Sequence, residues 1–238
     1  MGILRRFGEW KDTGVLLDGP GAWGLTSRFL HMWEMLGRRL PNEHDYYRPL
    51  ESRSAAGWCQ CFADGPANNP ENPAEDLYIQ CISSARRSIW ITTPYLAVED
   101  SVVRALCAAA DGGVDVRLML PGIWDHWYTK IVAGSYYERL LTHGVKIYEF
   151  TPGFLHAKSF VADGEAAMVG TVNMDYRSFQ LHYENGVMLY GAEAVGDIQQ
   201  DLTDVMARSA PVDLAAWRKR RWSRRALEKV LRVFSIWM

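Results

Sequence analysis

The sequence predicts an α/β fold, in which a mixed, largely parallel β-sheet is flanked by helices as an α/β/α sandwich. Three β-prone runs, at 88–93, 114–120 and 145–150, are separated by helical patterns at 102–110 and 131–141. Strands that alternate with helices favour right-handed crossovers between parallel strands. The 238 residues, 48% of them hydrophobic, suffice for one domain with a sizeable core.

The part of the chain before these strands predicts a short strand and a helix. Residues 13–17 are β-prone, and apolar side chains across 22–36 recur at helical spacing. Residues 37–57 are rich in Arg, Pro and polar groups without a period, which is typical of a linker. The chain therefore divides into three expected regions, a leading segment, a main domain and a tail: 1–50, 51–212 and 213–238.

Two further elements are expected to complete the main domain. Asn72 before Pro73, with an acidic residue at position 75, is typical of the start of a helix. Residues 183–190 are β-prone, and 194–206 have helical spacing. We expect the strand to extend the sheet and the second helix to cover it.

The stretch HAKSFVADGEAAMVGTVN at 156–173 carries the strongest functional signal. His156 and Lys158 are two residues apart, so on an extended strand their side chains leave the same face. Asp163 and Gly164 lie between two β-prone runs, and Asp-Gly in that position is a strong signal for a two-residue hairpin turn. We expect the chain to fold back there.

A two-residue turn fixes which side chains meet across this hairpin. Lys158 would face Val169, His156 would face Thr171, and Asn173 would lie diagonal to His156. An imidazole, an ammonium and a carboxamide on one face suit a phosphate, since one group attacks phosphorus while the others hold the charged oxygens. A bulged or longer loop would shift the pairing by one residue and turn Asn173 away.

The spacing HxK, four residues, D, six residues, GTxN resembles the HKD motif of the phospholipase D superfamily. The similarity extends to the second half of bacterial cardiolipin synthases at TTPY (92–95), GVKIYE (144–149), GFLHAK (153–158) and YENGV (183–187). WKDT (10–13) and 19–33 are similar to the end of the first half of those enzymes. The resemblance implies a phospholipase D-like fold with one HKD repeat and a phosphohistidine intermediate formed without metal or cofactor.

The resemblance also implies the roles of individual residues. His156 would be the nucleophile, Asp163 would orient the hairpin or the lysine, and Glu184 would hydrogen-bond a catalytic imidazole, although a solvated carboxylate at a strand edge is the alternative. Thr171 and Tyr95 are substrate-binding candidates, although a packed core tyrosine is as good a reading of Tyr95. The expected catalytic residues are His156, Lys158, Asp163, Asn173 and Glu184.

The chain holds one HKD motif, whereas the enzymes that it resembles have two that meet at a shared site. No repeat of the motif is detectable elsewhere. Phosphoryl transfer needs a second group to protonate the leaving alkoxide, and a positioned general acid is typically worth roughly a hundred- to ten-thousand-fold in rate. Either a homodimer or a separate first-half chain would supply that group, and we slightly favour the homodimer. The third alternative is that the chain is an inactive truncation.

The resemblance implies a phosphatidyltransferase that forms cardiolipin from phosphatidylglycerol. The alternative with the same chemistry is a phosphodiesterase that acts on nucleic acid. The net charge of −2 does not indicate a nucleic-acid partner. No histidine or cysteine has metal-ligand spacing, and the cysteines fit reduced thiols. No apolar run is long enough to cross a membrane, so we expect a peripheral protein on the cytoplasmic side of the cell membrane.

The tail from Trp217 onward is strongly basic and amphipathic. Its sequence, WRKRRWSRRALEKVLRVFSIWM, has one acidic residue, Glu228. Leu227, Val230, Leu231 and Phe234 fall on one helical face. Such a helix can lie on an anionic phospholipid surface, or it can dock on its own domain with a solvated basic face, and the sequence favours neither.

Overall fold

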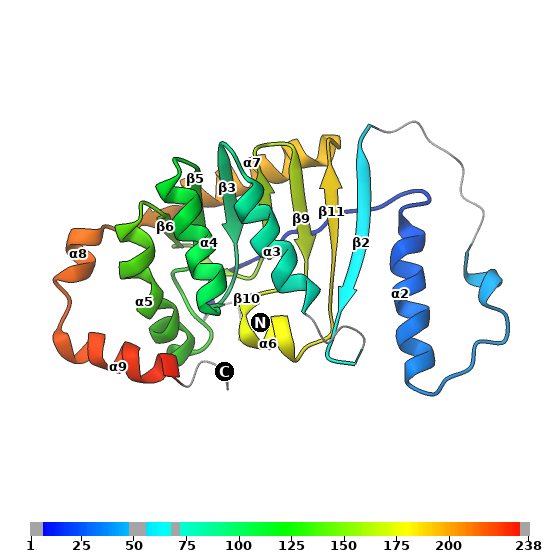
Figure 1. The fold of residues 1–238 in the computed structure, drawn as a ribbon, viewed down its shortest axis with the longest axis horizontal. Helices are drawn as coiled ribbons and strands as arrows, with labels where there is room; N and C mark the ends of the chain where they lie inside the picture. Colours follow the sequence, from blue (N-terminus) through cyan, green and yellow to red (C-terminus); the bar gives the residue numbers. More distant parts are fainter. Residues whose placement is uncertain (1–6, 48–55, 68–71, 234–238) are drawn as a thin grey trace.

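The structure is a computed structural model that describes residues 7–47, 56–67 and 72–233. Within these residues, eight strands form one twisted sheet (Figure 1). In their order across the sheet, the strands are β12 (Ser209–Pro211), β6 (Lys146–Phe150), β5 (Asp115–Pro121), β3 (Ser88–Thr92), β8 (Ser159–Ala162), β9 (Ala166–Gly170), β11 (Glu184–Tyr190) and β2 (Trp58–Asp64).

The sheet is mixed, as expected, but its parallel pairing is confined to β3, β5 and β6. The other neighbours pair antiparallel. Parallel neighbours need a long crossover, and helices supply it between β3, β5 and β6. The β8–β9 connection is too short for a crossover, so the chain returns antiparallel there. The expectation of a largely parallel sheet therefore applies to the helix-connected strands alone.

Helices cover both faces of the sheet. On one face lie α3 (Pro73–Ser84), α4 (Asp100–Asp111) and α5 (Trp127–Thr142), and on the other lies α7 (Glu193–Ala207) (Figure 1). Two buried clusters hold these layers together, one between the sheet and α3 to α5, the other between the sheet and α7. The predicted helices at 102–110, 131–141 and 194–206 and the helix start after Asn72 are confirmed.

Two small parallel pairs and several short elements lie beside this sheet. A parallel pair joins β1 (Glu9–Lys11) to β7 (Gly153–Leu155), and another joins β4 (Leu96–Ala97) to β10 (Met174–Asp175), just before α6 (Tyr176–Gln180). The expected helix at 22–36 is α2 (Ala22–Met35), which lies against β2 (Figure 1). The remaining elements are η1 (Glu43–Tyr46), α8 (Leu214–Arg218) and α9 (Trp222–Val233).

Three details at the start of the chain differ from the sequence prediction. Residues 13–17 belong to no strand ladder, because no neighbouring strand in the described part of the chain lies beside them. β1 precedes them and β2 was not predicted. The expected boundary between residues 50 and 51 lies outside the described residues.

The Asp-Gly turn forms as predicted, but the strands after it pair one residue out of the predicted register. Asp163 and Gly164 both have positive φ, +55° and +70°, and Glu165 N donates to Ala162 O at 3.0 Å. Ala162 then pairs with Ala166 rather than with Glu165. Glu165 is therefore an extra residue on the second strand, a bulge, and it places Lys158 opposite Gly170.

Asp163 fastens this turn to the start of β3. Its carboxylate accepts hydrogen bonds from the backbone N–H groups of Arg86 (2.9 Å), Arg87 (2.7 Å) and Ser88 (2.9 Å). Burial alone would raise the pKa of Asp163, but these three N–H donors outweigh it and hold the pKa below its usual value. The contact stabilises the pairing of β3 with β8, which is the strand that follows Lys158.

We expect Asp163→Ala to lower the free energy of unfolding by about 1–2 kcal/mol, because three backbone donors lose their acceptor. Since the folded pKa is depressed, this contribution is present above the unfolded pKa of about 4 and is lost as the pH falls through the folded value. Denaturant unfolding between neutral and acid pH measures both effects. Glu165→Ala, which removes an exposed ion pair with Arg87, should change stability by less than about 1 kcal/mol; equal losses in the two variants would contradict the assignment.

Candidate active site

His156 follows β7, and β1 brings Asp12 beside it. The parallel pairing aligns Lys11 with Leu155, and Lys11 O accepts hydrogen bonds from His156 N at 2.7 Å and Ala157 N at 3.1 Å. The next residue of the leading segment, Asp12, lies 2.8 Å from His156 Nδ1 through its Oδ2. A carboxylate at Nδ1 favours the tautomer that carries its proton there and leaves a lone pair on Nε2. This is the state that a nucleophilic imidazole needs.

Close backbone approach makes this pairing possible. Gly153 lies so near β1 that a Cβ atom there would stand 1.9 Å from Glu9 O. Beside it, the Trp10 ring lies 4.7 Å from the Phe154 ring and 5.2 Å from the His156 ring, measured between centroids. The imidazole, whose side chain is 35% exposed, is thus held between an indole and a carboxylate.

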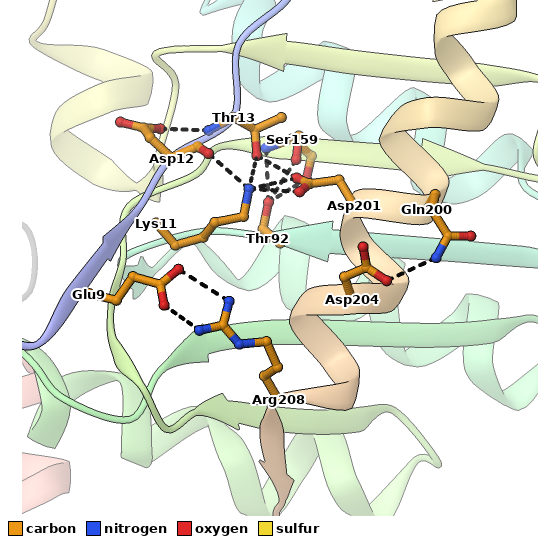
Figure 2. Close-up of polar contacts among 10 residues, drawn as sticks. All are labelled: Glu9, Lys11, Asp12, Thr13, Thr92, Ser159, Gln200, Asp201, Asp204 and Arg208. Carbon is orange, nitrogen blue, oxygen red and sulfur yellow. Dashed lines mark hydrogen bonds and ion pairs between the residues drawn. The ribbon is translucent and has the colours of Figure 1, made fainter.

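Helix α7 holds β1 and the residues after it in place (Figure 2). Lys11 forms an ion pair with Asp201 at 2.7 Å, and Thr13 Oγ1 donates to the same carboxylate at 2.7 Å. Just after α7 ends, Arg208 forms an ion pair with Glu9. Figure 2 shows Asp201 and Arg208 reaching toward the leading segment. The position of Asp12 therefore depends on contacts about 190 residues away in the sequence.

Lys158 is almost completely buried, with 6% of its surface exposed, and its Nζ donates to the carbonyl of His156. Burial lowers the pKa of Lys158 to about 8, although nearby carboxylates, of which Asp12 has the largest effect, oppose the shift. The next residue, Ser159, is fixed by a 2.8 Å hydrogen bond between its hydroxyl and that of Thr92. The ammonium is thus held close to the backbone of His156.

The bulge in the hairpin changes the surroundings of Thr171 and Asn173. Thr171 does not pair with His156; its Oγ1 donates to Glu184, and its N donates to Asn185 O at 2.8 Å. Asn173 Nδ2 donates to Ser178 Oγ at 3.0 Å, and its Oδ1 is buried without a hydrogen-bond partner. The predicted register was therefore wrong, because a longer loop shifts the second strand by one residue.

Glu184 begins β11 and is 8% exposed. Its carboxylate accepts the hydroxyl hydrogen of Thr171 and lies 3.4 Å from His182 Nδ1. The solvated strand-edge alternative is excluded by this burial. The imidazole that it approaches in this chain is that of His182, whereas His156 is paired with Asp12.

A cavity of about 160 Å³ opens beside Asn173. The Tyr95 hydroxyl at its edge donates to Asp125, and burial, together with this contact, raises the pKa of Tyr95 well above its usual value. Polar groups of His126, Arg177 and His182 also line the cavity. Of the predicted site residues, Tyr95 and Asn173 line this cavity. Asp163 lies at the far end of β8, and at a strand rise of about 3.3 Å per residue it is roughly 16 Å from Lys158. Among the described residues, no three His, Cys, Asp or Glu side chains cluster as metal ligands would.

Sequence reasoning assigned no role to Asp12, although a signal for it exists. Residues 12–35 align with 184–207 without a gap, and Asp12 then matches Glu184. Seven of these 24 positions are identical: Gly14/Gly186, Val15/Val187, Leu17/Leu189, Gly19/Gly191, Ala22/Ala194, Gly24/Gly196 and Leu30/Leu202. The chain therefore contains an internal repeat that the HKD motif itself does not reveal.

Comparison with known proteins shows the family of the chain. Residues 78–206, which include the whole hairpin, match the family described as cardiolipin synthase, PLD-like domain. The chain belongs to this family. It is 38% identical to cardiolipin synthase 2 of Bacillus anthracis over 99% of its own length and 46% of the relative, and 37% identical to cardiolipin synthase of Geobacillus thermodenitrificans over 96% and 46%. The chain spans about half the length of these relatives.

Solved structures confirm the fold. A phospholipase D family member, Nuc of Salmonella typhimurium, superposes with a TM-score of 0.55 at 21% identity and covers 66% of this chain and 98% of its own. Phosphatidylserine synthase of Haemophilus influenzae also has a TM-score of 0.55, at 12% identity over 74% of this chain and 45% of its own. The expected phospholipase D-like fold is thus correct.

We expect Lys158 to titrate near pH 8, and Asp12→Asn to lower that pKa further, since the carboxylate stabilises the charged ammonium. Because the folded pKa lies below the unfolded value of about 10.4, unfolding stability should rise with pH between these two values. NMR of ¹³C-labelled lysine follows the titration, and Lys158→Met identifies the resonance. Asp111→Asn, at the end of α4, should leave the pKa unchanged; a rise in the Asp12→Asn variant would contradict this geometry.

Proposed function

We propose that this chain is the second half of a phosphatidyltransferase of the cardiolipin synthase type. The contact between Asp12 and His156 is the observation that carries this proposal, because a carboxylate at Nδ1 favours the tautomer whose Nε2 has a lone pair, and the imidazole is partly exposed. The names of the relatives supply the product, cardiolipin. The substrate, phosphatidylglycerol, is the one that the sequence resemblance implies.

In the proposed first step, His156 Nε2 attacks the phosphorus of one phosphatidylglycerol. A P–N bond forms, the P–O bond to the glycerol head group breaks, and the departing alkoxide takes a proton from a general acid. In the second step, the hydroxyl of another phosphatidylglycerol gives its proton to the same group, which now acts as a base, and its oxygen attacks the phosphorus. The P–N bond breaks, which releases the histidine and gives cardiolipin. Lys158, with Asn173 beside the cavity, would stabilise the charged oxygens. Asp163 would act through the hairpin and not by contact with substrate.

The general acid is expected from a second HKD motif. Glu184 occupies the position in the internal repeat that Asp12 occupies, and Asp12 holds His156. Glu184 is therefore suited to hold the imidazole of that other motif in the same way. Its present neighbours are Thr171 and His182, and His182 also lines the cavity.

A labelled donor tests the covalent step. Vesicles of phosphatidylglycerol labelled with ³²P at the phosphodiester should leave an acid-labile, base-stable label on the protein. His156→Asn should remove this label and reduce lipid turnover at least about a thousandfold, because the nucleophile is gone. The matched control His143→Asn changes an exposed histidine that is paired with Asp111 and should retain both. Cleavage of single-stranded DNA that depends on His156, without lipid turnover, would instead support the phosphodiesterase alternative.

We also propose that α9 rests on an anionic membrane. The helix docks on α5, and Arg220, just before the helix, forms an ion pair with the buried Glu228 near its middle. Leu231 turns toward the domain, whereas Trp222, at 81%, and Val230, at 55%, remain exposed. The helix thus docks on its domain and still presents an apolar surface beside basic side chains. Phe234 lies outside the described residues. No helix in the described part of the chain could cross a bilayer.

We expect Arg221→Gln with Lys229→Gln to weaken binding to phosphatidylglycerol vesicles about 30-fold, since each basic group near an anionic surface contributes about 1 kcal/mol. Sedimentation with phosphatidylglycerol and with phosphatidylcholine vesicles measures the loss. Arg86→Gln with Arg104→Gln makes the same charge change on another part of the surface and should bind like the wild type. Equal weakening in the two double variants would show a nonspecific charge effect and refute the docking surface.

A further inference from the structure

The cavity beside Asn173 holds a second imidazole, that of His182. This side chain is partly exposed, and its Nδ1 lies 3.4 Å from Oε1 of Glu184, the carboxylate that begins β11. Nε2 is then the nitrogen left for a molecule in the cavity. The arrangement matches that of His156, whose Nδ1 faces Asp12. A carboxylate at Nδ1 orients an imidazole and stabilises the ring when it carries a second proton.

The short connection between the HKD motif and β11 fixes the position of His182. Its backbone N–H donates to Arg177 O at 2.9 Å, at the end of α6. The same helix begins after Asp175, whose carboxylate accepts a hydrogen bond from Ser178 N at 2.7 Å. The Ser178 hydroxyl in turn accepts a hydrogen bond from Asn173 Nδ2 at 3.0 Å. One helical turn thus joins His182 to the last residue of the motif.

Two carboxylates connect His182 to Lys158, the ammonium that would hold a phosphate. Glu184 stabilises the charge of Lys158 and also faces His182. Asp175 stabilises the charge of Lys158 as well. Burial raises the pKa of Asp175, and the charge of His182 opposes that shift. Because charge interactions weaken with distance, carboxylates that act on both groups place His182 near the phosphate that Lys158 would hold.

Two other groups at the cavity, Tyr95 and His126, are less suited to proton transfer. Tyr95 donates its hydroxyl hydrogen to Asp125, and burial, together with this contact, raises its pKa well above the usual value. His126 Nε2 lies 3.7 Å from Asp125, beyond hydrogen-bond distance. The two oxygens of Asp125 already accept hydrogen bonds from the Tyr95 hydroxyl and from the backbone of His126. Glu184, in contrast, has one oxygen facing His182.

We propose that His182 is the general acid and base for phosphoryl transfer in this chain. As the P–N bond to His156 forms and the P–O bond to the glycerol breaks, His182 Nε2 gives its proton to the departing oxygen, and the Nδ1 proton stays at Glu184. The acceptor hydroxyl then gives a proton back to Nε2, its oxygen bonds to phosphorus, and the P–N bond breaks. The inference rests on the proposed function, since it needs His156 as the nucleophile. It assigns to this chain the group otherwise expected from a second HKD motif.

Two donors with different leaving groups test this role with the chain alone. The glycerol alkoxide of phosphatidylglycerol needs a proton to leave, whereas p-nitrophenolate, from bis(p-nitrophenyl) phosphate, leaves as a stable anion. The second donor should therefore give a burst of p-nitrophenolate equal to the amount of protein, as His156 is phosphorylated. His182→Asn should keep the rate of this burst within about threefold and reduce turnover of phosphatidylglycerol vesicles at least about a hundredfold.

His143→Asn is the matched control, because Nδ1 of His143 also faces a carboxylate, that of Asp111, but the pair does not line the cavity. It should keep both reactions at the wild-type rates. Free imidazole should restore part of the lipid turnover in His182→Gly, since a small base can take the place of the lost side chain. A purely structural role of His182 would instead lower the burst and the turnover together and would not respond to imidazole.

Four results would overturn the proposal: lipid turnover retained in His182→Asn, equal losses of burst and turnover in that variant, the same selective loss in His126→Asn instead, or a wild-type burst without any lipid turnover. Each of these leaves His156 as the nucleophile, so the proposed function stands. A wild-type chain that gives no burst and no phosphorylated His156 would refute the proposed function, and the role of His182 with it.

Discussion

The parallel pairing of β1 with β7 is the constraint on which the site depends. It places Asp12 against His156 although 144 residues separate them in the sequence. Three residues of ladder are too few to hold two segments together in water, so other contacts must stabilise the pair. The ion pairs from α7 and the indole of Trp10 over Phe154 supply them. Helix α7 therefore has two structural roles, since it covers the sheet and also supports the segment that contacts His156.

Burial of Lys158 sets the electrostatic character of the site. An ammonium that is 6% exposed opposes folding unless carboxylates lie near it. Asp12, Glu184 and Asp175 are among the carboxylates that stabilise the charge of Lys158. With a pKa near 8, the ammonium of Lys158 is mostly charged at neutral pH, and burying this charge costs free energy of folding. In the proposed function, an anionic phosphate that binds beside Lys158 would offset that cost.

The leading segment contributes to the site and also repeats part of the sequence of the domain. Its first residues complete the site of this domain through β1, whereas 12–35 repeat the last strand and helix of the domain itself. Asp12 belongs to both descriptions, because it contacts His156 and is also the first residue of the repeated stretch.

The sequence alone determined the fold class, the helices around the sheet and the Asp-Gly turn, because these follow from local periodicity and turn chemistry. It also placed His156 and Lys158, whose spacing in the motif is local. Tertiary structure decided what these residues contact. The bulge at Glu165 moved Thr171 and Asn173 by one register step, since a hairpin signal fixes the turn and not the pairing beyond it. Asp12 contacts His156 because β1 pairs with β7, and the carboxylate of Asp163 accepts hydrogen bonds from the backbone at the start of β3. Neither contact could be predicted, because contacts between distant segments depend on packing that no local pattern encodes.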